Sequence, residues 1–141
     1  MLNDINQSYI KERIKDWKSR LNHMYLLVEG ALSDKQNIVC KKTRHTTLYE
    51  ELMQKYNVDS EDIPILDIYK NKVIIATFKP VGLWVIGANG RIDILTKSGA
   101  YIVIDTAEIG QKPVWKVFTP KNRKFARKLD LSLILELVNQ A

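Results

Sequence analysis

The densest group of side chains that could do chemistry in this sequence is a basic run close to its C-terminal end. The run reads Lys121-Asn-Arg-Lys-Phe-Ala-Arg-Lys128, and no acidic residue lies between Ile109 and Leu129. Seven cations fall in that wider stretch, namely Lys112, Lys116, Lys121, Arg123, Lys124, Arg127 and Lys128. The formal net charge of the chain is +6, so without these seven it would be −1. The positive charge of the protein therefore belongs to one segment.

Clustered positive charge of this kind is the electrostatic footprint of a phosphate-backbone partner, and Phe125 offers a surface on which a base can stack. An acidic protein surface would satisfy the same charges, and short basic runs also occur as solvated connections. No helix-turn-helix turn, RNP-like strand or zinc spacing accompanies the run. A second basic patch at residues 41–45 would support the phosphate interpretation if it lay beside the first in space. We predict a binding module rather than an enzyme, with nucleic acid slightly favoured over an acidic protein as its anionic partner.

Two aspartates on neighbouring predicted strands form a second candidate site, in Gly90-Arg-Ile-Asp93 and Ile102-Val-Ile-Asp105. In these residues the chain resembles the metal-dependent nucleases of the PD-(D/E)xK type. In that family an aspartate on one strand and a D/E-x-K motif on the next bind magnesium and activate water. The resemblance implies catalytic roles for Asp93 and Asp105, although Ala107 stands where the motif has lysine, a role left to Lys97 or Lys112. A divergent or degenerate nuclease is therefore our alternative hypothesis.

The turn between these two strands decides whether the aspartates can share a metal ion. A two-residue turn at Ser98-Gly99 would place Asp93 and Asp105 on opposite faces of the hairpin. A three-residue loop that includes Lys97 would place them on the same face, because a shift of one residue turns every side chain over. The sequence leaves both turns open.

Other familiar kinds of site are not predicted. His23 and His45 have no cysteine or histidine neighbours at metal-ligand spacing, so we expect no metal and no cofactor. Cys40 is the single cysteine and fits an apolar packing role in a reducing compartment. No apolar stretch approaches the roughly 18 residues of a membrane span, and the N-terminus has no signal-peptide pattern. These features predict a cytoplasmic protein without membrane contact.

The elements that must position the basic segment begin with a long N-terminal helix, which we expect Asp4 to cap and Gly30 to end. Its apolar residues alternate steps of four and three, at Ile10, Ile14, Trp17, Leu21, Met24 and Val28. This heptad-like seam is typical of a helix that covers a sheet within one chain or of one that pairs with a second chain. Intramolecular cover is favoured, and a dimerising structural or interaction subunit remains the third hypothesis.

A short second helix is expected to open at a capping box, Thr47-Leu-Tyr-Glu50, and to end near Lys55, with a loop over residues 57–64. Strand-like runs follow at residues 65–69, 73–78, 82–88, 91–97, 100–105 and 114–118. Residues 79–82 and Asn89-Gly90 are expected to be turns, because proline disfavours a central ladder and Asn-Gly favours a type I′ hairpin. The last helix carries Leu131, Ile134, Leu135 and Val138 on one side.

These elements predict a single α+β domain over residues 1–141. It comprises a helical part at residues 1–58, an antiparallel meander of five or six strands at residues 63–118, and the basic segment with the C-terminal helix at residues 119–141. The long helix should cover one face of the sheet, and the last helix part of the other face.

Overall fold

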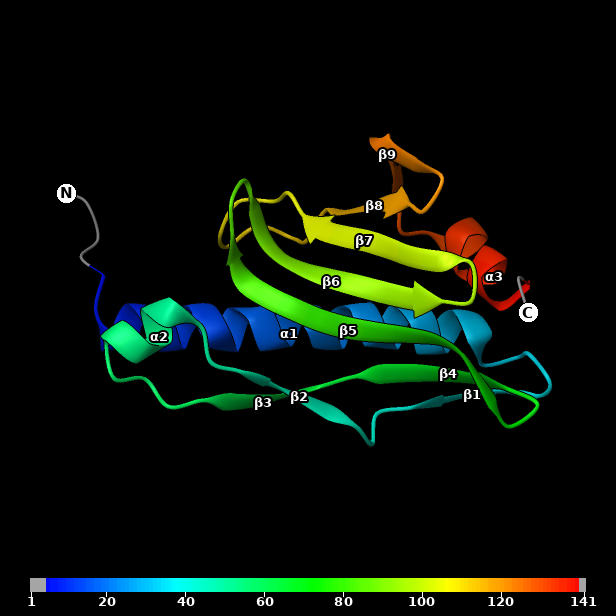
Figure 1. Ribbon diagram of the computed structural model, residues 1–141, viewed down its shortest axis with the longest axis horizontal. Helices are drawn as coiled ribbons and strands as arrows, with labels where there is room; N and C mark the ends of the chain where they lie inside the picture. Colours follow the sequence, from blue (N-terminus) through cyan, green and yellow to red (C-terminus); the bar gives the residue numbers. More distant parts are fainter. Residues whose placement is uncertain (1–4, 140–141) are drawn as a thin grey trace.

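The computed structural model describes residues 5–139 and confirms the α+β fold. A long helix, α1 (Gln7–Leu32), runs behind an antiparallel sheet, and a shorter helix, α3 (Leu131–Asn139), lies near the C-terminal end of α1 (Figure 1). The other elements, in chain order, are β1 (Ile38–Lys41), β2 (His45–Leu48), α2 (Glu51–Lys55), β3 (Glu61–Pro64), β4 (Leu66–Lys70), β5 (Val73–Val85), β6 (Ala88–Thr96), β7 (Gly99–Asp105), β8 (Trp115–Thr119) and β9 (Asn122–Lys128).

Seven strands form one sheet in the order β1-β4-β5-β6-β7-β8-β9, and β2 and β3 form a separate pair. All neighbouring strands are antiparallel, and β4 to β9 follow one another both in sequence and in space. The predicted meander of five or six strands is thus confirmed as the six strands β4 to β9, and the whole sheet has seven strands. The strand β1 extends it at one edge, and the basic segment itself forms β9 at the other edge instead of a connection.

The strand β5 is longer than predicted and moves the turn that follows it. It continues through residues 79–82 with a register shift between Pro80 and Gly82, so the expected turn there is wrong. The chain instead turns at Ile86-Gly87, and Asn89 and Gly90 lie inside β6. Gly90 has a φ of 101°, and a Cβ at this position would lie 2.2 Å from the ring of Trp17. The Asn-Gly pair therefore serves the close approach of α1 to the sheet, not a hairpin turn.

The apolar seam of α1 forms the centre of the hydrophobic core. Its six residues are each no more than 3% exposed: Ile10, Ile14, Trp17, Leu21, Met24 and Val28. They share one buried cluster with strand residues such as Phe78, Ile92, Ile94 and Val103. The helix therefore covers the sheet within this chain, as favoured by the sequence, and its seam is buried there.

The ends of α1 differ from the prediction. Asn6 is the N-cap, and its side-chain oxygen accepts a hydrogen bond from the backbone N–H of Tyr9 at 2.9 Å. Asp4, which was predicted as the cap, lies outside the described residues. Gly30 does not end the helix, which continues for two residues and ends at Leu32.

The region between β1 and β4 is also more strand-like than predicted. Thr47 belongs to β2, so it does not cap the second helix, and α2 follows Glu50, whose side chain makes no capping bond. The Glu50 carboxylate accepts hydrogen bonds from the backbone N–H groups of Leu83 and Trp84 instead. Part of the expected loop at residues 57–64 is β3, which pairs with β2.

The helix α3 lies on the same side of the sheet as α1, which corrects the prediction that it would cover the other face. Its residues Leu133 and Ile134 belong to the core that contains the α1 seam, and α3 contacts both α1 and β5. No helix of the described residues lies over the opposite side of β5–β8 (Figure 1). We call this side, turned away from α1, the outer face of the sheet.

Candidate anion-binding surface

The basic segment forms most of the β8–β9 hairpin at the edge of the large sheet. All seven residues of β9 are exposed. Lys116 of β8 stands directly opposite Lys128 of β9, and Val117 stands opposite Arg127. Residues directly opposite each other share a face of the sheet. Since Val117 is fully buried on the α1 side, Lys116 and Lys128 lie together on the outer face.

A large bulge interrupts the pairing of β9 between its two paired ends. The pair Val117–Arg127 is followed by the pair Thr119–Asn122, so residues 123–126 of β9 stand against Phe118 alone. The Asn122 side-chain oxygen accepts hydrogen bonds from the backbone N–H groups of Lys124 and Phe125, at 3.1 and 3.2 Å. This local bonding holds the bulge open. It leaves the Phe125 side chain 74% exposed between cations.

The structure separates the seven predicted cations into groups. Lys116 and Lys128 share the outer face, and Arg123 and Lys124 lie on the bulge. Arg127 turns toward α3 and forms an ion pair with Glu136 at 2.8 Å; the same two residues and Lys121 line a small cavity. Lys112 lies in the loop before β8 and lines a different cavity beside α1. Four of the seven therefore remain candidates for one continuous surface: Lys116, Arg123, Lys124 and Lys128.

The strand register adds two cations that the sequence analysis did not assign to the surface. One row across the outer face contains Lys128, Lys116, Ile104 and Arg91, in that order on β9, β8, β7 and β6. The adjacent row contains Phe118, Ile102, Asp93 and Lys79, on β8, β7, β6 and β5. We call these eight residues the cationic rows. Asp93 is their only carboxylate, and it accepts hydrogen bonds from Arg91.

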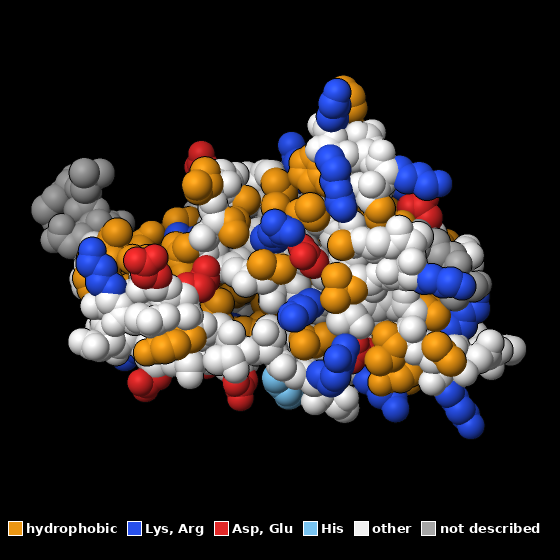
Figure 2. Space-filling model, in the orientation of Figure 1, with side chains coloured by type: hydrophobic (Ala, Val, Ile, Leu, Met, Phe, Trp, Pro, Cys, Tyr) orange, Lys and Arg blue, Asp and Glu red, His pale blue; other side chains and the backbone are white. Residues whose placement is uncertain are grey.

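The cationic rows mix positive charge with partly exposed apolar side chains. Ile102, Ile104 and Phe118 are each half-buried, and Leu95 on the same face is 43% exposed. Figure 2 shows Lys and Arg side chains dispersed among hydrophobic ones across this side of the molecule. The surface thus presents separate cations among apolar side chains, on a face of the sheet that no described helix covers.

The second basic patch, at residues 41–45, does not lie beside the first. The strand β1 is at the opposite edge of the sheet from β9, so the expected support from this patch is absent. Its charges are engaged locally: the Lys41 ammonium lies over the Tyr69 ring, and the Arg44 guanidinium donates hydrogen bonds to Asp67 at 2.8 and 2.7 Å. These bonds from Arg44 hold the pKa of Asp67 below its ordinary value.

The two aspartates of the nuclease hypothesis point to opposite faces. The hairpin turn is Lys97-Ser98, because Thr96 pairs with Gly99, and Asp93 consequently stands opposite Ile102 on the outer face. Asp105 lies on the α1 side and is fully buried. A shared metal ion between Asp93 and Asp105 is excluded by this register.

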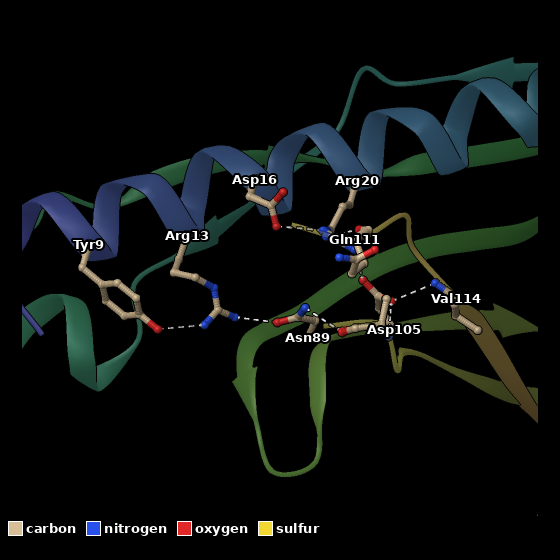
Figure 3. A network of polar contacts seen from close by, with 9 residues as sticks. Tyr9, Arg13, Asp16, Arg20, Asn89, Asp105, Gln111 and Val114 are labelled. Atoms are coloured by element: carbon tan, nitrogen blue, oxygen red, sulfur yellow. Dashed lines mark hydrogen bonds and ion pairs between the residues drawn. The ribbon is translucent and has the colours of Figure 1, made fainter. Parts of the chain in front are cut away.

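Asp105 instead anchors α1 to the end of the sheet (Figure 3). One of its carboxylate oxygens accepts a hydrogen bond from Arg20 at 2.6 Å, and the other accepts from the backbone N–H groups of Ala107 and Val114. Arg20 also contacts Asp16 and the backbone oxygen of Gln111. Both carboxylate oxygens are thus engaged in holding the loop before β8 against the helix.

The remaining reactive side chains form no centre. Within residues 5–139 no group of three or more His, Cys, Asp or Glu residues is close enough to hold a metal ion. Cys40 is half-buried, and burial raises the pKa of its thiol, which disfavours the reactive thiolate. Trp115 packs against Trp17 with ring centroids 6.4 Å apart, so it belongs to the core side of the sheet.

Comparisons with known proteins do not identify a family for this chain. No known protein family matches it, and no curated protein or solved structure gives a significant match. Across the described residues, every helix is too short or too polar to cross a membrane. The case for a function therefore depends on the surface itself.

Proposed function

We propose that this protein is a non-enzymatic nucleic-acid-binding module that contacts phosphates through the outer face of its sheet and the β8–β9 hairpin. One observation carries the proposal. The register places Lys128, Lys116, Arg91 and Lys79 on one face of the sheet that no described helix covers, with a single carboxylate among them that is already paired to Arg91.

The spacing of these cations suits a chain of phosphates better than a single anion. Neighbouring strands lie about 4.8 Å apart, so the row from Lys128 to Arg91 spans three strand spacings, or roughly 14 Å. Separate cations over this length would each neutralise a different phosphate and release its counterions. Affinity from such contacts depends weakly on base sequence and strongly on salt.

The direct test is fluorescence anisotropy with labelled random-sequence oligonucleotides, titrated at several salt concentrations. We expect binding that weakens steeply as salt rises. Replacement of both Lys116 and Lys128 by glutamine should weaken binding at low salt. It should also reduce the slope of log K against log salt by about 1.4 for a single strand, since each lost phosphate contact contributes about 0.7.

A matched control is provided by α1, on the other side of the sheet. Lys11 and Lys15 are exposed there, and their replacement by glutamine removes the same net charge. If the outer face is the binding surface, this control variant should keep nearly the wild-type slope. An equal reduction of the salt slope in the two double variants would mean that binding depends only on the net charge of the protein and would overturn the assignment to the outer face. An absence of binding at low salt would refute the proposal and favour an acidic protein partner.

A further inference from the structure

We infer that the outer face binds single-stranded nucleic acid in preference to duplex. Phe125 is the exposed side chain on which a base stacks, and the cationic rows contact the phosphates and the other bases. This inference rests on the proposed function and specifies the form of its ligand. Phosphate binding alone does not explain the partly exposed apolar side chains of this surface.

The apolar side chains lie between the cations, not apart from them. Ile104 separates Lys116 from Arg91 in one row, and Ile102 lies beside Phe118 in the next. A duplex turns its phosphates outward and keeps the faces of its bases stacked inside, so it would gain little from these residues. A single strand exposes base faces that can rest on apolar and aromatic side chains while its phosphates reach the flanking cations.

Phe125 supplies the second observation. It is one of the most exposed large hydrophobic side chains in the described chain, and the bulge that presents it is held by two hydrogen bonds from its own and the preceding backbone N–H to Asn122. Arg123 and Lys124 precede it, and Arg123 bonds the backbone oxygen of Phe118. An exposed aromatic ring beside cations is the combination that binds unpaired bases without sequence preference.

The bulge also argues against a peptide strand as the ligand at this edge. Added strands need a regular row of free backbone N–H and C=O groups. Two of the N–H groups of β9 are already bonded to the Asn122 side chain, and residues 123–126 depart from the ladder. The edge is thus poorly suited to main-chain pairing but leaves its side chains free to contact a ligand.

The test compares the affinities of three ligands of equal length: single-stranded DNA, single-stranded RNA of the same sequence, and the annealed DNA duplex. We expect both single strands to bind more tightly than the duplex at the same salt concentration. Phe125→Ala should weaken single-strand binding about fivefold or more, because stacking of a base on an aromatic ring is worth upwards of about 1 kcal/mol. The salt slope should not change, since no charge is lost.

Two control variants separate stacking from a general loss of apolar surface. Phe125→Trp keeps an aromatic face and should retain single-strand affinity. Tyr49→Ala removes another exposed aromatic side chain, 51% exposed and outside the cationic rows, and should leave affinity unchanged. Comparable melting temperatures for all three variants would show that the fold is intact.

The outcomes distinguish this inference from the proposed function. Equal or tighter duplex binding would overturn the single-strand assignment while leaving nucleic-acid binding in place. Single-strand binding that is unaffected by Phe125→Ala would overturn the role of Phe125. An absence of binding to all three ligands at low salt would overturn both the inference and the function on which it rests.

Discussion

Gly90 has a structural role that can be tested separately from binding. Its positive φ and the Trp17 ring 2.2 Å from an added Cβ leave no room for a side chain. We expect Gly90→Ala to lower the free energy of unfolding by about 2–4 kcal/mol, combining backbone strain with overpacking of the core. Urea denaturation measures this directly.

The matched control for that substitution is Gly30→Ala. Gly30 is helical and has no atom within 4 Å of an added Cβ. Because alanine favours helix over glycine, this variant should be more stable than wild type by about 0.5–1 kcal/mol. Similar losses of stability in both variants would contradict the close packing of Trp17 on β6.

The buried pair Arg20–Asp105 should respond unequally to the loss of either partner. Without Arg20, the fully buried Asp105 keeps only backbone N–H donors. Without the Asp105 charge, Arg20 still has Asp16 and the Gln111 backbone oxygen. We therefore expect Arg20→Met to cost about 3–5 kcal/mol in unfolding free energy and Asp105→Asn to cost clearly less. Equal costs in chemical denaturation would contradict this arrangement.

At the scale of elements, Arg44 fastens the segment between β1 and β2 to β4 and β5. It donates to Asp67, which also accepts a hydrogen bond from Thr77 at 2.7 Å. These bonds lower the pKa of Asp67 in the folded state, against the opposing effect of burial. A lowered folded-state pKa contributes stability above the unfolded-state pKa, near 3.9, and that contribution is lost as pH falls through the folded-state value.

Asp67→Asn should therefore reduce stability at pH 7 by about 1–3 kcal/mol and flatten the loss of stability below about pH 4. Urea midpoints measured from pH 7 down to pH 2 would show both effects. Asp62→Asn, at an exposed carboxylate on β3, serves as the control and should leave the loss of stability at acidic pH nearly unchanged. If the stability of Asp67→Asn fell as steeply with decreasing pH as that of wild type, the stabilising role of this carboxylate would be refuted.

How far the sequence predicts these elements depends on what sets each boundary. The seam of α1 and the strand runs were readable because burial imposes a period on apolar residues. The turn expected at Asn89-Gly90 is wrong because a glycine is needed there for another reason. Its missing side chain makes room for the ring of Trp17, which lies 73 positions away in sequence. The strand β9 was missed because exposed edge residues carry no apolar alternation.

The proposed surface was only half predictable for a similar reason. The basic segment stands out as a run, and it supplied Lys116 and Lys128. Lys79 and Arg91 are isolated in sequence and join the surface only through the register of β5, β6 and β7. Arg127 is paired with Glu136 and Lys112 lies in the loop before β8, so both lie away from this surface, which the net charge alone does not reveal.

At the scale of the whole molecule, α1 and α3 pack on one side of the sheet only, and this supports a last prediction about α1. Its seam is the core of a single chain, so a charge placed there should unfold the protein rather than release a folded monomer from a dimer. We expect Ile14→Asp, at a position 3% exposed, to abolish the helical circular dichroism signal and the cooperative thermal transition.

Leu26→Asp provides the comparison on the same helix, because Leu26 is 54% exposed. That variant should remain folded, with a free energy of unfolding within about 0.5 kcal/mol of the wild-type value. A folded Ile14→Asp protein with half the wild-type mass in light scattering would restore the dimerising seam and overturn the intramolecular role of α1. Unfolding of Ile14→Asp but not of Leu26→Asp would instead show that the fold of the sheet depends on the burial of the α1 seam.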